Sequence, residues 1–359
     1  MSAPDCVNGT VCDASQNKQS FSTHANSTIL TNGQSIGLAV SILSSTTRIT
    51  LSRAQLTAEA SFLSFGAVIV VSIFIVRNLL RYRKLLPNGD WKLLRTPADI
   101  YMLFLFAFDI LQAVGGILNV RWAHDGIVTT GPYCTAQGII KQMGELGVAL
   151  LSLALTVHTF TIALWSVGAE ARSFAFGFVA FTCLFSVLWV SISNGIHKDF
   201  ETPTPYWCWI GPKYIKERLA GEYVWMWIAL FASVVMYILL HFWMKGHLSV
   251  DGEKWYKFRL VKSDVEYSER RATLGILFYP LAYTLVVIPL SVSRWLLFNH
   301  KKVPSAATFF GIIMFHLSGA VNVLLFLIVR PRLLLFTPPE KLGKFKGTFQ
   351  PKQQLYSLT

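Results

Sequence analysis

The strongest constraint on this chain is a set of seven long stretches that contain very few charged residues. A helix needs roughly 20 mostly apolar residues to cross the hydrocarbon core of a bilayer. The last four stretches contain no Asp, Glu, Lys or Arg, and each is too long for a buried strand or a short core helix. The sequence therefore predicts an all-α membrane protein, a bundle of seven transmembrane helices over residues 57–76, 97–120, 134–166, 173–196, 223–244, 272–293 and 303–329.

The composition agrees with a membrane protein and argues against a soluble one. Hydrophobic residues make up 53% of the 359 residues and charged residues only 14%, whereas a soluble domain carries about 25% charged residues. The formal net charge of +13 fits either nucleic-acid binding or a positively charged membrane face. Because the chain contains seven stretches of spanning length, we expect a lipid bilayer as its partner and no nucleic acid.

The distribution of basic residues predicts how the bundle is oriented. With the N-terminus outside and the C-terminus in the cytoplasm, the inner connections hold 20 Lys and Arg residues and the outer ones hold 10. Inner loops of membrane proteins carry such an excess. Two glycosylation sequons, at Asn8 and Asn26, fall in the same outer tail. We therefore expect a plasma-membrane protein with an extracellular, glycosylated and disordered tail (1–56), a seven-helix domain (57–330) and a short basic cytoplasmic tail (331–359).

Two of the five cysteines are predicted to face the outside of the cell. Cys134 lies at the outer end of the third span, and Cys208 lies in the second outer loop. A disulfide persists in an oxidising compartment, so we expect these two to be bridged, with two free thiols as the alternative. Cys6 and Cys12 could pair within the tail. Cys183, inside the fourth span, is expected to pack as a small apolar side chain.

Asp109 is an acidic residue in the middle of the second span. A carboxylate at that depth costs several kcal/mol unless it is paired, protonated or hydrated. Asn322 lies at a similar depth in the seventh span and is the expected partner. The contact is expected to be either a switch with two arrangements or a static hydrogen bond between helices.

Lys141 and Glu145 are a second pair of charged residues within a predicted span. They are four residues apart and therefore lie on one face of the third helix. Two opposite charges below the outer surface indicate either a water-filled cavity open to the outside or a closed ion pair. If they line a cavity, a polar pocket with an aromatic rim is expected around them, and its candidate ligand-binding residues are Asn119, Trp122, Gln137, Lys141, Glu145, Trp209 and Arg294.

Short patterns follow one another in a fixed order along the spans: LFAFDILQAVGG at 105–116, VRW at 120–122, TVHTFT at 156–161, YPLAY at 279–283, IPLSVSR at 288–294 and SGAVN at 318–322. With seven spans, an outer N-terminus and the two outer cysteines, this set resembles the fungal G-protein-coupled receptors grouped as glucose-receptor-like and cyclic-AMP-receptor-like. The resemblance covers residues 60–331. The spans lack the Asp-Arg-Tyr, Cys-Trp-x-Pro and Asn-Pro-x-x-Tyr motifs of rhodopsin-like receptors, so the activation details of that class do not transfer.

The resemblance implies a receptor that senses a nutrient or another small extracellular molecule. It would promote nucleotide exchange on the α subunit (Gα) of a heterotrimeric G protein, with signalling of the cyclic-AMP type. Pro280 and Pro289 interrupt the backbone hydrogen bonds of the sixth span, so they allow it to bend. Outward movement of its inner half would open a cleft for the G protein, with a basic rim formed by Lys92, Arg172, Arg270 and Arg271.

The sequence also bears on other classes of seven-helix membrane protein. The intramembrane histidines lie near no acidic cluster, whereas zinc needs three or four converging ligands, so we expect no metal, no cofactor and no enzymatic activity. A seven-helix zinc hydrolase would also need the opposite orientation. A retinal protein is excluded because the seventh span has no lysine. A transporter or channel remains the alternative, with Asp109, Lys141 and Glu145 marking a permeation path.

Overall fold

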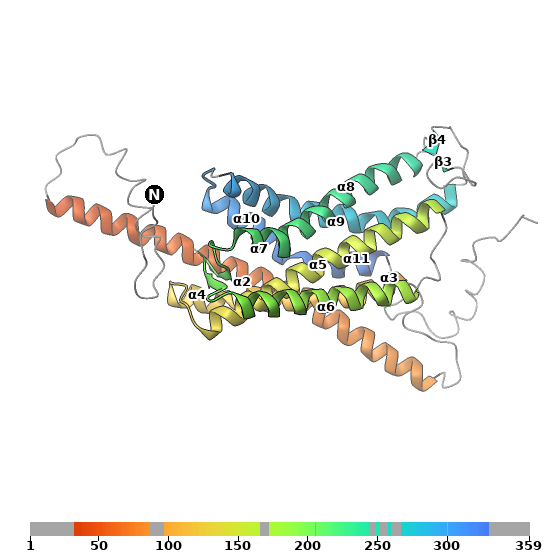
Figure 1. The fold of residues 1–359 in the computed structure, drawn as a ribbon, viewed down its shortest axis with the longest axis horizontal. Helices are drawn as coiled ribbons and strands as arrows, with labels where there is room; N and C mark the ends of the chain where they lie inside the picture. Colours follow the sequence, from red (N-terminus) through yellow and green to blue (C-terminus); the bar gives the residue numbers. More distant parts are fainter. Residues whose placement is uncertain are drawn as a thin grey trace, which may run out of the picture.

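The structure is a computed structural model, and it describes residues 32–85, 97–165, 172–204, 206–244, 249–250, 258–259, 267–299 and 301–329. Most of these residues are helical, and the remainder form two short β-hairpins and connecting turns (Figure 1). Five residues singled out from the sequence lie outside the described part: Cys6, Asn8, Cys12, Asn26 and Lys92.

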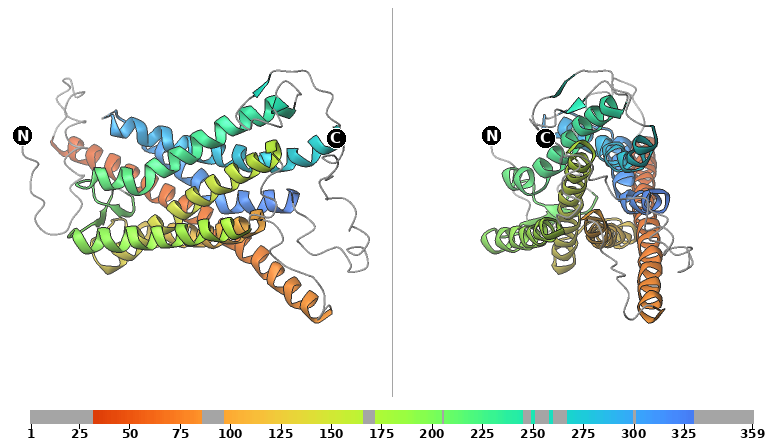
Figure 2. Two further views of the ribbon diagram at one scale, coloured as in Figure 1. Left: turned by 45° about the vertical axis from the view of Figure 1, so that its right-hand side comes forward. Right: turned by 90° about the vertical axis from the view of Figure 1, so that its right-hand side faces the viewer.

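Within the described ranges, six helical segments are long and apolar enough to cross a membrane, and a bent pair of helices makes a seventh span. In chain order the spans are α2 (Asn32–Leu85), α3 (Pro97–Ile117) with α4 (Asn119–Asp125), α5 (Pro132–Trp165), α6 (Arg172–Ile196), α7 (Ile215–Arg218) with the π-helix η1 (Leu219–Tyr223) and α8 (Val224–Met244), α9 (Tyr267–Phe298), and α10 (Ser305–His316) with α11 (Ser318–Val329). They form one elongated bundle (Figure 2). The predicted all-α bundle of seven spans is confirmed.

Several helices extend beyond their predicted spans or are broken within them. Helix α2 begins at Asn32, and the fifth span begins at Ile215 rather than at 223. The seventh span is interrupted at Leu317, where α10 and α11 meet at a bend of 40°. Apolar composition locates the membrane-crossing part of a helix, whereas backbone hydrogen bonding continues into the polar residues on either side.

Helix α5 occupies the centre of the bundle. In its span 83% of the residues are buried, against 28% for α6 and for the span that contains α8. Glycines let α3 and α5 approach closely, because small residues allow helix backbones to come together. A Cβ added to Gly144 would lie 2.5 Å from the backbone nitrogen of Gln112 on α3, and one added to Gly147 would overlap the ring of Phe108.

A β-hairpin packs against one end of α5. Strands β1 (Glu201–Pro203) and β2 (Cys208–Ile210) pair antiparallel, with Thr202 opposite Trp209. Helices α4, α7 and α10 lie at this end of the bundle, called here the disulfide end. The two-residue strands β3 (Ser249–Val250) and β4 (Phe258–Arg259) lie at the opposite end (Figure 1).

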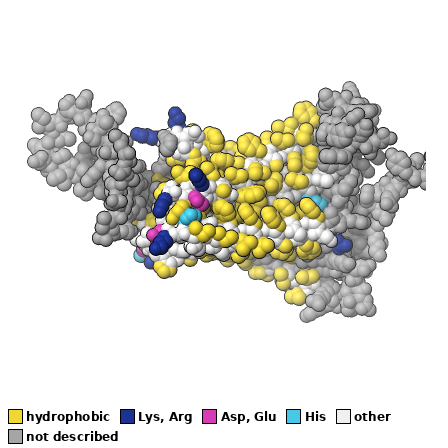
Figure 3. All heavy atoms as spheres, in the orientation of Figure 1, with side chains coloured by type: hydrophobic (Ala, Val, Ile, Leu, Met, Phe, Trp, Pro, Cys, Tyr) yellow, Lys and Arg dark blue, Asp and Glu magenta, His cyan; other side chains and the backbone are white. Residues whose placement is uncertain are grey.

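The outer surface of the bundle is apolar over most of its length. On the face drawn in Figure 3, a broad hydrophobic band covers the middle, and charged side chains gather at the disulfide end. Large apolar side chains such as Phe62, Phe174 and Phe231 are exposed on three different helices. Such a continuous apolar surface is unfavourable in water and fits a helix bundle surrounded by lipid.

Candidate ligand-binding site

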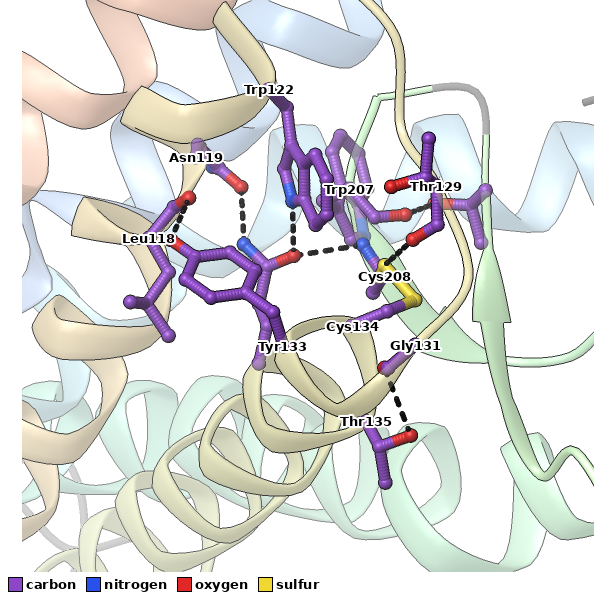
Figure 4. The surroundings of a disulfide bond; sticks show 12 residues. Leu118, Asn119, Trp122, Thr129, Gly131, Tyr133, Cys134, Thr135, Trp207 and Cys208 are labelled. Carbon is purple, nitrogen blue, oxygen red and sulfur yellow. Dashed lines mark hydrogen bonds between the residues drawn. A yellow bond between two sulfur atoms is a disulfide. The ribbon is translucent and has the colours of Figure 1, made fainter. Parts of the chain in front are cut away.

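The disulfide end is held together by one covalent bond and one buried amide. A disulfide joins Cys134, near the start of α5, to Cys208 of β2. Beside it, the Oε1 of Gln137 accepts hydrogen bonds from Trp122 Nε1 (2.7 Å) and from the backbone nitrogen of Cys208 (3.0 Å). Its Nε2 donates to Asn119 Oδ1 (2.7 Å) and to the carbonyl of Gly115. Figure 4 shows Asn119 and Trp122 near the disulfide between Cys134 and Cys208.

These contacts use both acceptor sites and both donor hydrogens of the Gln137 amide. The side chain is completely buried. It therefore links α3, α4, α5 and the hairpin, and it has no hydrogen-bonding capacity left for a ligand. Of the seven ligand-binding candidates, three (Asn119, Trp122 and Gln137) belong to this internal network.

Lys141 and Glu145 form a closed ion pair one to two turns further along α5. Lys141 Nζ lies 3.4 Å from Glu145 Oε1, and both side chains are buried. Glu222 lines the same small cavity as this pair, and its carboxyl accepts a hydrogen bond from Trp209 Nε1 (2.9 Å). The cavity among these side chains has a volume of about 20 Å³, enough for about one water molecule.

The hairpin presents two tryptophans, one on either side of Cys208, to three cations. Trp207 lies beneath the Lys141 ammonium (5.2 Å to the ring centroid) and the Arg294 guanidinium (5.4 Å). Trp209 faces Arg294 (5.7 Å) and Arg218 (4.8 Å) on α7. Desolvated cation–π contacts of this kind each stabilise by about 2 kcal/mol. The loop is therefore attached to α5, α7 and α9 by its aromatic rings as well as by the disulfide.

A much larger cavity, of about 750 Å³, lies on the other side of these tryptophans. Its walls come from the hairpin, from α7, η1 and α8, and from the ends of α9 and α10. Pockets of about 300–1,000 Å³ are typical of small-molecule sites. Two of the seven sequence candidates, Trp209 and Arg294, line this cavity. The seven residues thus divide into a hydrogen-bond network, an ion pair and a cavity wall, all at the disulfide end.

Some residues of this end were not identified from the sequence. Glu222 precedes the predicted fifth span, yet it is buried inside the bundle because the π-helix η1 contains an extra residue per turn and changes the direction of the side chains before α8. A π-turn has no reliable sequence signature. Trp207 and Arg218 could have been identified more easily from the sequence, because Trp207 precedes Cys208 directly and Arg218 follows the same aromatic loop.

Glu201 is a buried carboxyl of the hairpin, outside the membrane-spanning helices. It accepts a hydrogen bond from Gln142 of α5 and lies against Gly138, where a Cβ would overlap it. Burial raises the pKa of the Glu201 carboxyl to about 7, although hydrogen bonds from Gln142 and Asn194 and the charge of Arg218 act in the opposite direction. Its charge therefore changes near neutral pH.

Asp109 lies in a separate polar cluster in the middle of the bundle. Its Oδ2 accepts a hydrogen bond from Asn322 Nδ2 (2.9 Å), and its Oδ1 accepts one from Ser318 Oγ (3.5 Å). Gln112 donates to Ser318 Oγ (3.2 Å) and to the carbonyl of Phe315 (2.8 Å), beside the break between α10 and α11. The structure thus brings the two expected partners into contact.

For the other expected switch and G-protein residues, the structure gives positions on the helices but few side-chain contacts. Pro280 and Pro289 both lie within α9, and Gly311 of α10 packs directly on the α9 backbone at Pro289. Arg172 is exposed at the start of α6. Arg270 and Arg271 lie in the first turns of α9, and their side chains, like that of Pro280, are outside the described part. The described residues give no contact among the basic side chains.

The described part of the chain contains no group of three or more His, Cys, Asp or Glu residues that could hold a metal ion. The arrangement is that of a seven-helix membrane protein with a disulfide-linked hairpin over one end of the bundle. The crystal structure of squid rhodopsin has a similar fold, with a TM-score of 0.54 and 13% sequence identity over 85% of this chain and 93% of that chain. No protein-family model matches the chain, and no curated protein matches it.

Proposed function

We propose that this chain is a G-protein-coupled receptor for a small extracellular molecule. The observation that carries the proposal is the seven-helix fold shared with squid rhodopsin, itself a seven-transmembrane receptor of this class. The cavity of about 750 Å³ at the disulfide end supplies a site of suitable size for a ligand. The motif order that resembles fungal glucose-receptor-like and cyclic-AMP-receptor-like proteins favours a nutrient ligand and cyclic-AMP-type signalling.

The orientation in this proposal places the disulfide end outside the cell. An outer N-terminus and a cytoplasmic C-terminus follow from the excess of basic residues in the inner connections. The disulfide Cys134–Cys208 is consistent with this choice, because such bonds persist in oxidising compartments. The protein then resides in the plasma membrane, with glycans on Asn8 and Asn26.

Signalling requires that a ligand bind the active state more tightly than the resting state. The cavity is walled by α8, α9 and α10, so a ligand there contacts the helix that contains Pro280 and Pro289. A change in the bend of α9 would open the opposite end of the bundle. There Arg172, Arg270, Arg271 and Lys92 would meet the Gα subunit.

The experiment is nucleotide exchange on Gα in nanodiscs that contain the purified chain. Sugars, amino acids and small organic acids are added as candidate ligands, and empty nanodiscs serve as the control. Faster exchange with the receptor than without it, increased by at least one compound, is the expected result. An unchanged exchange rate together with solute flux in proteoliposomes would instead identify a transporter or channel.

The orientation has its own experiment, performed in yeast cells. We expect endoglycosidase treatment to increase the mobility of the wild-type chain and to leave an Asn8→Gln/Asn26→Gln variant unchanged. A tail that carries no glycan, and that protease reaches only after the cells are permeabilised, would reverse the orientation.

A further inference from the structure

The wall of the large cavity contains two basic side chains and no acidic one. Arg218 and Arg294 line the cavity, and its other lining residues are aromatic, aliphatic or uncharged polar side chains. Neither guanidinium lies within 4.0 Å of a carboxylate among the residues that the structure describes, since the ion pairs found there involve other basic residues. A cavity lined by charges of one sign attracts molecules of the opposite sign.

Both guanidinium groups retain hydrogen-bond donors that the protein does not use. The Arg294 guanidinium lies over the rings of Trp207 (5.4 Å) and Trp209 (5.7 Å), and its Nε has no hydrogen-bond partner in the described part of the chain. Arg218 stacks on Trp209 and donates from Nε and Nη2 to a single carbonyl, that of Ile210. A guanidinium has five N–H donors, and stacking on its faces leaves the edge free for a bidentate contact with an anion.

The carboxyl groups behind the tryptophans form no ion pair with these two arginines. Glu145 forms its ion pair with Lys141, and Glu222 accepts a hydrogen bond from Trp209. The third carboxyl, Glu201, faces Gln142 of α5 and is not part of the cavity wall. Arg218 and Arg294, the two basic side chains of the cavity wall, therefore have no carboxylate within ion-pair distance among the described residues.

We infer that the cavity binds an organic anion with one carboxylate or phosphate group and a flat apolar body, the anionic group lying between Arg218 and Arg294. Trp227, Tyr223 and Phe298 supply aromatic surface for the body. The inference deepens the proposed function by naming the ligand class, and it rests on that function only in treating the cavity as a ligand site.

Two sources of such an anion are compatible with the shape of the cavity. Ile215 and Trp295 line it and are 51% and 58% exposed, so it reaches the outer surface of the bundle. A molecule dissolved in water and an anionic lipid of the outer leaflet both offer an acidic group on an apolar body. The experiment separates them by changing the lipid.

The probes are three compounds with the same indole body: indole-3-acetate, its neutral amide and tryptamine. Binding is measured by isothermal titration to the full chain in nanodiscs of phosphatidylcholine, with no G protein present. Because hydrogen bonds to charged groups are worth more than neutral ones, we expect the carboxylate to bind about 10- to 100-fold more tightly than the amide. We expect tryptamine to bind most weakly.

The variants test whether the two arginines carry this preference. Arg218→Gln and Arg294→Gln should each remove most of the preference for the carboxylate over the amide. Lys216→Gln is the matched control, because this exposed lysine lies two residues from Arg218, outside the cavity wall. It should leave the preference unchanged. If Arg294→Gln does not fold, Arg294→Lys is used in its place. Because this variant keeps the charge, it should retain part of the preference for the carboxylate over the amide.

Further nanodiscs contain phosphatidic acid in place of part of the phosphatidylcholine. Weaker probe binding in these discs by the wild type, and unchanged binding by the arginine variants, would support the site and identify the lipid as its anion. Equal binding of the three probes would overturn the inference, as would a complete absence of binding with no effect of lipid. Anion binding without nucleotide exchange would retain the inference and reject only the coupling to a G protein.

Discussion

Two of the buried polar clusters that the structure describes compensate buried charge differently. At the disulfide end, the charged cluster of Lys141, Glu145 and Glu222 contains an ion pair between Lys141 and Glu145, and it is covered by two tryptophans of the hairpin. In the middle, Asp109 is compensated only by the neutral donors of Asn322 and Ser318.

The difference concerns how easily each contact can be exchanged. Separating the charged cluster would leave isolated ions in a medium of low dielectric constant, which is strongly unfavourable. An amide or hydroxyl donor costs less to exchange, and a water molecule can replace it. We therefore expect the charged cluster to fix one end of the bundle, and a second arrangement of α3 relative to α11, if the Asp109 contact is a switch, to involve the Asp109 cluster.

The largest effect is expected from Lys141→Met, which removes the cation of the charged cluster. Breaking a buried ion pair by removing one partner costs about 3–5 kcal/mol, so little folded protein should reach the membrane. Thermal unfolding of detergent-solubilised protein and surface labelling measure the loss. A Lys141→Met/Glu145→Gln double variant should recover most of the stability. Equal instability of both variants would show that the ion pair is not the cause.

Glu201 tests whether a third carboxyl at the disulfide end behaves like the charged cluster. The pKa of its carboxyl rises from 4.5 to about 7 on folding, so between these values the folded state holds a proton that the unfolded state releases. Stability should therefore decrease as pH increases through this range, by up to about 3 kcal/mol, since one pKa unit corresponds to about 1.4 kcal/mol.

Glu201→Gln should remove the contribution of this carboxyl, so the decrease becomes smaller and the variant is more stable than the wild type at pH 8. Glu59→Gln alters an exposed carboxyl of α2 and should keep the wild-type pH dependence. Melting temperatures between pH 4 and pH 8 provide the measurement. A wild-type profile that is flat over this range would contradict the expected burial of charge.

Gly144→Ala tests the point where the two clusters meet, since Gly144 lies beside Glu145 and against the backbone of Gln112. The added methyl would force α3 and α5 apart, and overpacking of this kind costs about 1–3 kcal/mol. Gly66→Ala is the matched control, because no atom lies within 4 Å of its Cβ position. It should stabilise the helix by about 0.5–1 kcal/mol. Similar melting temperatures for the two variants would rule out close packing at Gly144.

The smallest effect on stability, and the most informative for signalling, is expected from Asp109→Asn. Asn keeps the shape of the side chain and removes its charge, so the protein should fold and reach the surface. If the Asp109–Asn322 contact is a switch, the coupling between ligand and G protein, typically about 1–3 kcal/mol, should change. Surface labelling and Gα nucleotide exchange are measured together for Asp109→Asn, Asn322→Asp and the double swap.

A defect in each single variant that the swap partly restores would assign the contact to the mechanism. Normal signalling per surface molecule in all three would identify a static hydrogen bond between helices. The charged cluster should show the reverse behaviour, with a loss of folded protein and little change in signalling per molecule.

Much of the architecture follows from elementary patterns in the sequence. The seven spans follow from hydropathy, because a bilayer requires long apolar helices. The contact between Lys141 and Glu145 follows from a spacing of four residues, and the partners Asp109 and Asn322 follow from their similar depth. Each of these inferences uses either the spacing of residues within one helix or the depth of a residue in the membrane. Both quantities follow from counting residues along the chain.

Residue counting could not show that the seven candidate ligand-binding residues divide into a hydrogen-bond network, an ion pair and a cavity wall. Gln137 and Lys141 are one helical turn apart, yet the first is fully hydrogen-bonded within the protein and the second forms an ion pair. Whether either side chain is available to a ligand depends on where the hairpin residues Trp207 and Trp209 pack. That packing depends on contacts between elements distant in sequence, and Glu222 adds a π-turn that no local pattern indicates.

The π-helix Leu219–Tyr223 lies between α7 and α8 and sets how the side chains of α7 are rotated about the helix axis relative to those of α8. An α-helix turns by about 100° per residue, so deletion of a single codon in this segment would rotate α7 by about that angle relative to α8. Arg218 would then leave the cavity wall, while the side chains from Val224 onward would keep their contacts with lipid and with the bundle. A membrane protein built in this way can change the lining of the cavity at its disulfide end by gaining or losing one amino acid, without redesigning the helix that crosses the membrane.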